Sequence, residues 1–400
     1  MFPVAAPRLS VNLRRWGRGA LACSALGVAV GLVACGGGTR QNFFAPTKIV
    51  AFGDENSAIS EFSGNLVNGS GAPVTLKGLT YTVQTAARDA TPVVCAKKTP
   101  PALCDTASGT FGTVVGSPTY YAFNDFSSTK LELDSSATQL QRTTTTLYQC
   151  DVASIWVQFV ARGYGKGFSG QCSLDAGGAV SYATFGAKTA DVINQINTRR
   201  GELGKGVLVT VMVGQNDILE QFAAIRANSP TTTESAAIAE LEGRADSMAA
   251  AIKVIIGTGA KVVVARTPSL NNSPRVASSP VDAALLAKLV AAYNDRLYDR
   301  GLGNLSGRDV VGVNTDIFTN TGTRNNSYNY VTPLCNLSSL TRPDGTTPSG
   351  LDEQDVRFCN TAGPLNGSIS TLMWADTVRF GPLGHSLIGS LAFNRARNQL

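Results

Sequence analysis

Histidine is nearly absent from this sequence. Its 400 residues include a single one, His385. Metal sites built from several histidines are therefore excluded. Any chemistry that relies on an imidazole as general base has His385 as its only candidate.

Charged residues are also scarce, at 16% of the chain against 43% hydrophobic residues. The formal charge is +6, from 34 basic and 28 acidic residues. Four of the basic residues lie in an amino-terminal segment that has no acids: Arg8, Arg14, Arg15 and Arg18. The rest of the chain is near neutral and has no basic run, so we expect no nucleic-acid partner. The length and apolar content suit one large α/β domain or two domains.

An uncharged apolar run, Ala20–Ala34, follows the arginine-bearing residues 1–19. It is short for a bilayer span and typical of a secretory signal peptide. Its end, Leu32-Val33-Ala34-Cys35, resembles the bacterial lipobox, whose cysteine is diacylated and becomes the first residue of the mature protein. An ordinary cleaved signal and an uncleaved anchor helix are the alternatives.

The lipobox resemblance implies a lipid anchor. Residues 1–35 would be the signal peptide and lipobox, with lipid on Cys35. Residues 36–47, which begin with three glycines, would form a flexible linker. Gly36, rather than Asp, follows the cysteine, which by analogy implies sorting to the outer membrane. We therefore expect a cell-envelope protein at the periplasmic or surface face of that membrane.

Six cysteines remain once Cys23 leaves with the signal peptide and Cys35 carries lipid. An even number in an oxidising compartment indicates disulfides, for which six cysteines allow 15 pairings. We expect the sequential pairing, whose loops are of modest length: Cys95–Cys104, Cys150–Cys172 and Cys335–Cys359. A metal site is disfavoured because the chain has no Cys-x-x-Cys pair.

Short apolar runs alternate with longer helical patterns. Lys48–Gly53 is typical of a buried parallel strand that ends in a turn. Three further strands are predicted, at Val207–Val213, Lys261–Arg266 and Val310–Asn314, and helices at 151–162, 189–199, 234–257, 281–300 and 382–395. Such alternation predicts a doubly wound parallel sheet between two layers of helices, a three-layer α/β/α fold.

Two segments interrupt this pattern. Residues 62–149 are rich in Gly, Ser, Thr and Pro, with alternating stretches that predict a β-rich insertion. Residues 318–370 form a long polar excursion that Cys335–Cys359 would staple. Residues 48–400, including these two segments, are predicted to form one domain.

Sites in such sheets form at the carboxyl ends of strands, and four segments are candidates. They read Gly53-Asp54-Glu55-Asn56-Ser57, Ser181-Tyr182-Ala183-Thr184-Phe185-Gly186-Ala187, Gly214-Gln215-Asn216-Asp217 and Asp376-Thr377-Val378-Arg379, the last followed by Gly384-His385. In this order they resemble the four sequence blocks of the SGNH/GDSL ester hydrolases, from Lys48 to about Asn398. The resemblance implies a flavodoxin-like fold and no metal or organic cofactor.

The resemblance also implies a role for each position. Glu55 stands at the nucleophile position, where the family has serine, and Arg379 at the base position, where it has histidine. Asp376 is the acid of the last block. Gly186 and Asn216 would supply the oxyanion-hole donors, and three further residues would be structural: Asp54, Gly214 and Asp217.

The two replacements remove the nucleophile–base pair. Arginine is not a general base, because its pKa exceeds about 12. We expect Glu55 and Arg379 to form an ion pair with Asp376 on the guanidinium; independent solvation of each residue is the alternative. Ser57 and His385 are poor substitutes, since two residues along a helical turn rotate a side chain by about 200°.

The sequence thus predicts an esterase-fold envelope lipoprotein that is non-catalytic and has a binding or structural role. Its oxyanion hole would be empty and open to an ester, acetylated glycan or carboxylate. The alternative is an active hydrolase of carboxylic or acyl-glycan esters, with Glu55 as nucleophile or base. A weaker alternative is a glycosidase-like pair of Glu55 and Asp376, with carboxylates about 5–9.5 Å apart.

Overall fold

The computed structural model describes residues 43–62, 76–83, 87–88, 120–121, 125–133, 140–148, 155–168, 178–227, 232–320, 325–340, 353–359 and 365–400. Its contacts divide the chain into Met1–Phe43 and Phe44–Leu400, and the fold below is that of the second unit. The expected signal peptide, Cys35 and most of the linker lie outside the described residues. So do four of the cysteines expected in disulfides: Cys95, Cys104, Cys150 and Cys172.

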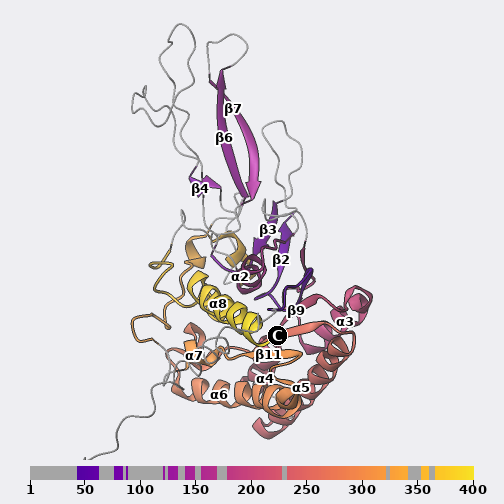
Figure 1. Ribbon diagram of the computed structural model, residues 1–400. Coiled ribbons are helices and arrows are strands. Elements are labelled where there is room, and N and C mark those ends of the chain that lie inside the picture. The colour runs from indigo at the N-terminus through magenta and orange to yellow at the C-terminus, as the bar shows by residue number, and fades with distance from the viewer. Residues whose placement is uncertain are drawn as a thin grey trace, which may run out of the picture. The chain divides into compact units, whose positions relative to one another are not determined.

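A five-stranded parallel sheet forms the centre of this unit (Figure 1). Its order is β11-β10-β9-β1-β8, with β1 at Lys48–Gly53, β8 at Ala179–Ser181, β9 at Val207–Met212, β10 at Lys261–Ala265 and β11 at Val310–Val313. All six residues of β9 are buried, as a central strand covered on both faces requires. This order is the flavodoxin-like one, and the predicted fold class is confirmed.

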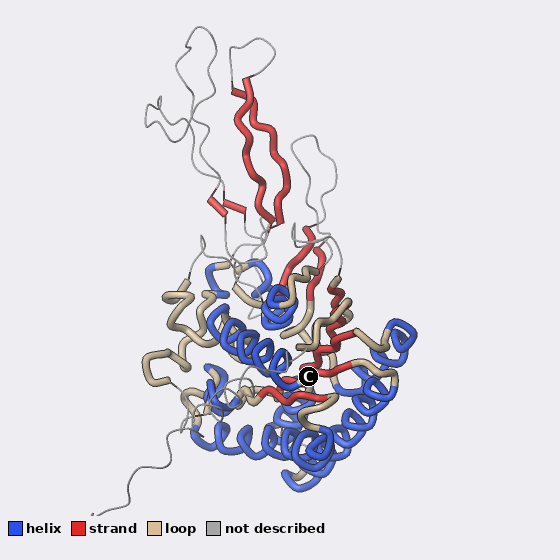
Figure 2. The backbone as a smooth tube through the Cα atoms, viewed as in Figure 1, coloured by secondary structure: helices blue, strands red, loops and turns tan. Residues whose placement is uncertain are grey.

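Helices pack on both faces of the sheet (Figure 2). On one face α8 (Pro382–Gln399) packs against α2 (Trp156–Gly163) and against β10 and β11. On the other, α5 (Glu234–Gly257) packs against β10 and against three further helices: α3 (Thr189–Arg199), α4 (Gln215–Arg226) and α6 (Pro280–Asn294). The apolar strands are thereby removed from water on both sides.

Glycines let α2 and α8 approach closely. A Cβ atom on Gly389 of α8 would lie 2.4 Å from Phe159, and one on Gly163 of α2 would lie 2.4 Å from the ring of Phe393. Real side chains essentially never tolerate such contacts, so each helix presents a glycine to an aromatic ring of the other. Trp156, at the start of α2, is fully buried in this layer.

Paired strands occur within the segment expected to be β-rich. The antiparallel pairs are β2 (Ile59–Phe62) with β3 (Leu76–Thr80), β4 (Ala87–Arg88) with β5 (Tyr120–Tyr121), and β6 (Asp125–Leu133) with β7 (Leu140–Tyr148). The alternating stretch predicted at Thr80–Gln84 begins where β3 ends.

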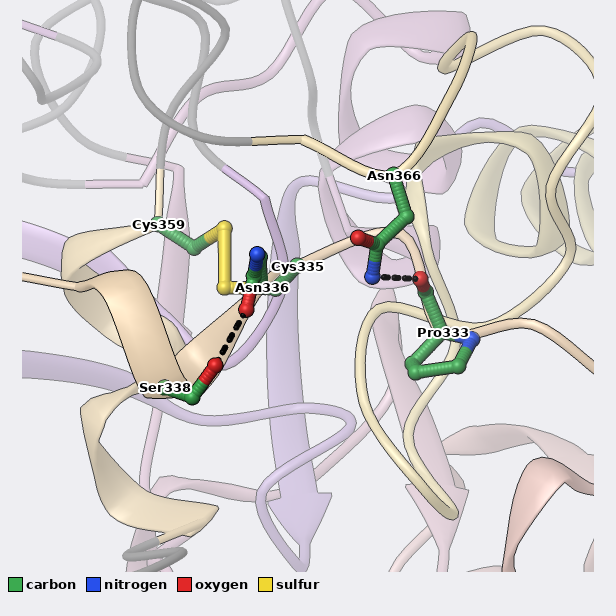
Figure 3. Close-up of a disulfide and its surroundings, with 6 residues drawn as sticks. All are labelled: Pro333, Cys335, Asn336, Ser338, Cys359 and Asn366. Carbon is green, nitrogen blue, oxygen red and sulfur yellow. Dashed lines mark hydrogen bonds between the residues drawn. A yellow bond between two sulfur atoms is a disulfide. The ribbon is translucent and has the colours of Figure 1, made fainter.

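The excursion after β11 contains short helical turns and one disulfide. The turns are α7 (Asp316–Thr319), η6 (Leu337–Ser339) and η7 (Glu353–Phe358). Cys335 and Cys359 are bonded, with Cα atoms 5.9 Å apart, which confirms that predicted pair (Figure 3). The amides of Leu334 and Cys335 donate to the carbonyls of Trp374 and Ala375, both at 2.8 Å. The disulfide-bonded segment therefore supports the chain directly before Asp376.

Two helical predictions need correction. The helix expected over 281–300 ends at Asn294 and continues as a π-helix, η4 (Asp295–Leu302). Helix α4, which begins at Gln215 within the third sequence block, was not predicted, because its polar first turn hides the helical period. The remaining short turns are η1 (Arg200–Glu202), η2 (Leu270–Asn272), η3 (Pro274–Val276) and η5 (Gly303–Leu305). Within the described part of the chain, no helix is both long and apolar enough to span a membrane.

Candidate active site

Glu55 lies in the tight turn that follows β1. Gly53 ends the strand with φ +148°, and a Cβ atom there would be 2.3 Å from the carbonyl oxygen of Met212. Only glycine permits this approach of β1 to the end of β9. The amide of Asp54 then donates to the Met212 carbonyl at 3.2 Å, and the turn directs the Glu55 side chain into the protein, where it is fully buried.

The Glu55 carboxylate binds both of the predicted oxyanion-hole donors. Its Oε2 accepts from the amide of Gly186 at 3.0 Å and from Nδ2 of Asn216 at 2.8 Å. Its Oε1 accepts from Nε and Nη2 of Arg379 at 3.2 and 3.1 Å. The expectation of an empty hole is therefore wrong. The glutamate side chain is long enough to place one carboxylate oxygen within hydrogen-bond distance of both donors.

Arg379 joins both acids of the site. Its Nη1 donates to Oδ2 of Asp376 at 2.6 Å, while Oδ1 of Asp376 accepts from the amides of Val378 and Arg379 at 2.9 and 2.7 Å. The guanidinium also lies over the ring of Phe185, 4.9 Å from its centroid. The ion pair expected between Glu55 and Arg379, with Asp376 on the same guanidinium, is thus present, and all three side chains are buried.

Two glycines position the oxyanion donors. Gly186 has φ +72°, a left-handed conformation that turns its amide toward Glu55. Gly214, with φ +115°, caps α4 and leaves room for a tyrosine, since a Cβ atom would lie 2.4 Å from the ring of Tyr293. Asn216 then lies in the first turn of α4, and its Nδ2 is also held by the carbonyl of Ala187 at 3.1 Å. The structural role expected for Gly214 fits this geometry.

Asp217 supports the turn beside the hole. Its Oδ2 accepts from the amide and hydroxyl of Thr189 at 2.9 and 3.1 Å, and its Oδ1 accepts from Nη1 of Arg244 at 3.0 Å. Burial raises the pKa of Asp217, against the lowering effect of these donors. The contacts tie α3 to α4 and α5, consistent with the structural role predicted.

Asp54 stabilises the turn that carries Glu55. Its Oδ1 accepts from the amide and side chain of Asn56 at 3.0 and 3.1 Å. Burial, and then the negative charge of Glu55, raise the pKa of Asp54 well above its usual range. The turn therefore places a third carboxyl group beside the ion pair of Glu55 and Arg379.

Ser57 and His385 do not form a displaced catalytic pair. The Ser57 hydroxyl accepts from the indole Nε1 of Trp156 at 3.1 Å, whereas Nδ1 of His385 accepts from the backbone amide of Trp156 at 3.3 Å. No hydrogen bond joins Ser57 to His385 among the residues that the structure describes. Burial lowers the pKa of His385 to about 3, so its imidazole is neutral and packs edge-on against Phe380.

Sequence reasoning missed the side chains around the site. Phe185 contacts Arg379 and Arg244 contacts Asp217, whereas Trp156 contacts Ser57 and His385. Of these three side chains only Phe185, which precedes Gly186, stands in one of the four blocks. The signal for Phe185 was its place beside an oxyanion donor. No cluster of three metal-binding side chains occurs in the described ranges.

The sheet order, the turn after β1 and the two predicted oxyanion donors are those of the α/β ester-hydrolase fold. Comparison with protein families gives the more specific identification. Residues 120–351 match the GDSL-like Lipase/Acylhydrolase family, more than half of the chain, and this protein belongs to that family. The matched segment contains Gly186 and Asn216 but none of Glu55, Asp376 and Arg379.

Solved structures of lipolytic proteins are similar over part of the chain. A G-D-S-L family lipolytic protein of Veillonella parvula is 12% identical, with 60% of this chain and 86% of that chain covered and a TM-score of 0.32. An extracellular lipase of Streptomyces rimosus is 15% identical, with 61% and 86% covered and a TM-score of 0.34. Phospholipase A1 of Streptomyces albidoflavus is 15% identical, with 56% and 82% covered and a TM-score of 0.32. A comparison with curated proteins finds no match.

Proposed function

We propose that this protein is a non-catalytic member of its family, held in the bacterial cell envelope by lipid on Cys35, where it has a binding or structural role. One observation carries the non-catalytic part. Oε2 of Glu55 already accepts from both oxyanion donors, the Gly186 amide and the Asn216 side chain.

Ester hydrolysis needs these donors free. In acyl transfer they stabilise the developing oxyanion from about 2.7–3.1 Å, and the loss of one donor slows the reaction by about 10²–10³. Here a substrate carbonyl can reach them only if the Glu55 carboxylate leaves. Both oxygens of that carboxylate are bound, one by the two donors and the other by Arg379.

The site also has no activated nucleophile. A carboxylate nucleophile must reach its substrate, but Glu55 is fully buried and accepts four hydrogen bonds. Arg379 remains protonated and is not a base. One guanidinium binds both Glu55 and Asp376, whereas a glycosidase-type pair needs its two carboxyl groups free to face the scissile bond.

Hydrolysis of p-nitrophenyl acetate and butyrate by residues 36–400 tests the non-catalytic proposal. We expect no turnover above that of buffer and no change in Glu55→Ala. Turnover that disappears in Glu55→Ala would contradict the proposal and establish the active-hydrolase alternative.

A double variant tests whether the rest of the hydrolase site is intact. Glu55→Ser with Arg379→His restores a hydroxyl and an imidazole and frees the oxyanion donors, so we expect it to gain ester hydrolysis. Glu55→Ser alone is the matched control, because it frees the hole without supplying a base. Equal activity in the two variants would show that the gain does not come from a serine–histidine pair.

The lipid anchor rests on the sequence Leu32-Val33-Ala34-Cys35 and the apolar run before it. Labelled palmitate supplied to cells that express the full chain should enter the wild type and not Cys35→Ser. Membrane fractionation should place the labelled protein in the outer membrane. Labelling of Cys35→Ser would reject Cys35 as the attachment site.

A further inference from the structure

A cavity lies beside β11, the strand at one edge of the sheet. Its volume is about 260 Å³, and its lining comes from β10, β11, η4 and α8, including Arg266, Tyr298, Asp299, Gly312 and Arg395. None of its lining residues belongs to the Glu55 site or contacts it. What this cavity can bind therefore depends only on the groups that line it.

The edge strand presents backbone groups to this cavity. In the sheet β11 pairs only with β10. The Val313 carbonyl accepts from the amide of Arg266, which directly follows β10, so the neighbouring Gly312 faces the outer side, where the Val310 carbonyl accepts from the amide of Gly307 at 2.9 Å. Its carbonyl accepts from Nη1 of Arg395 at 2.9 Å. Its amide has no hydrogen-bond partner among the residues described, and a side chain at position 312 would press on the ring of Tyr298, 3.1 Å from a Cβ atom.

Two arginines line the same cavity. Arg395 donates to Gly312 and has no carboxylate partner in the part of the chain that the structure describes. Arg266 donates from Nη2 to Asp299 at 3.0 Å and lies over the ring of Tyr298, 4.7 Å from its centroid. With two guanidinium groups against one carboxylate, the charged lining has a net charge of +1. The Gly312 amide and the remaining N–H groups of Arg395 are donors without a partner among the residues described.

We propose that this cavity binds an oxyanion, a carboxylate or phosphate group, through the Arg395 guanidinium and the Gly312 amide, with Arg266 adding positive charge. A planar guanidinium presents two parallel donors to such groups, and the backbone amide adds a third. The volume exceeds that of several waters, at about 30 Å³ each, so the ligand can carry a body larger than the anionic group. This binding site does not depend on the state of the Glu55 site.

Titration calorimetry on residues 36–400 tests the proposal. Sodium acetate and inorganic phosphate are titrated separately, with chloride holding the ionic strength constant. We expect saturable binding of one ion per chain for at least one of them, and the tighter one identifies the chemistry. Arg395→Gln should weaken binding at least tenfold, since it removes the charge. Arg397→Gln, an exposed arginine on the same helix, is the matched control and should bind as the wild type does.

A crystal soaked in selenate supplies a second measurement that needs no variant. We expect an anomalous peak within hydrogen-bond distance of Arg395 and the Gly312 amide. Arg395→Lys keeps the positive charge but loses the paired N–H donors of the guanidinium. Its affinity for the anion should lie between those of the wild type and Arg395→Gln. The proposal is overturned if neither ion saturates, if Arg395→Gln folds and binds as tightly as the wild type, or if selenate binds elsewhere.

Discussion

Two charge clusters flank the oxyanion hole, and they differ in solvent contact. In the first, Arg379 joins Glu55 and Asp376, and the three side chains are 4%, 0% and 0% exposed. In the second, Arg244 joins the buried Asp217 to Glu220, whose side chains are 23%, 1% and 37% exposed. Each cluster has one arginine between acids, but only the first is sealed from water.

The difference shows where the fold now depends on charge. Taking ions out of water is costly, and the cost is met only when every charge remains paired and hydrogen-bonded. The first cluster meets that condition with the two oxyanion donors as extra partners. In the second, water screens part of each interaction. The positions that would carry chemistry in a hydrolase are therefore the more demanding ones for folding here.

Removal of the sealed cation should have the largest effect. Arg379→Met leaves Glu55 and Asp376 buried without a counter-charge, and we expect the free energy of unfolding to fall by about 3–5 kcal/mol. Urea denaturation of residues 36–400 measures the change. Arg200→Met, at an exposed position, is the control. A loss below about 1 kcal/mol would mean that the first cluster is as well screened as the second.

The second cluster should respond less to the same change. Arg244→Met removes a charged hydrogen bond from Asp217, but Thr189 still donates two. We expect a loss of about 1–2 kcal/mol, since such bonds contribute about 1.5–3 kcal/mol when dry and Arg244 is partly exposed. A loss equal to that of Arg379→Met, in the same denaturation assay, would remove the distinction between the clusters.

The pH dependence of stability should show the charge crowding beside Glu55. Burial and Glu55 raise the pKa of Asp54, so above pH about 3.9 the folded state holds a proton that the unfolded state has lost. Stability should therefore fall as pH rises, by up to about 1.4 kcal/mol per unit, until the folded-state pKa is passed. Asp54→Asn should remove this slope between pH 4.5 and 7.5. If denaturation shows that the free energy of unfolding of Asp54→Asn still falls as steeply from pH 4.5 to pH 7.5, another group is responsible for the titration.

The smallest effect is expected at the outer end of the second cluster. Lys188 forms an ion pair with Glu220, and the two side chains are 42% and 37% exposed. Lys188→Met should change the free energy of unfolding by no more than about 0.5 kcal/mol. A larger loss in denaturation would indicate that Lys188 is coupled to the buried Asp217.

The fold was largely predictable because its strands are short apolar runs with helical patterns between them. Helices 189–199 and 234–257 begin and end where the sequence predicts them. Helix α4 was missed because Asn216 and Asp217 are polar and serve the site, so local function obscured the helical pattern. The π-helix after Asn294 has no signal in the apolar period.

The site was predictable in composition but not in geometry. Opposite charges at positions 55 and 379 predicted an ion pair, since both blocks meet at the carboxyl edge of the sheet. The sequence does not show that Oε2 of Glu55 points toward the two donors, because that orientation depends on the turn at Gly53 and the conformation of Gly186. The sequence alone therefore does not predict that Glu55 binds the two oxyanion donors.

Because the Glu55 carboxylate also binds Arg379, a substitution at one of these two positions changes the environment of the other. Serine at position 55 alone would leave Asp376 bound to the Arg379 guanidinium, whereas histidine at position 379 alone would take the guanidinium away from two buried carboxylates. The two substitutions therefore differ in cost, and the change at position 379 should destabilise the protein more than the change at position 55.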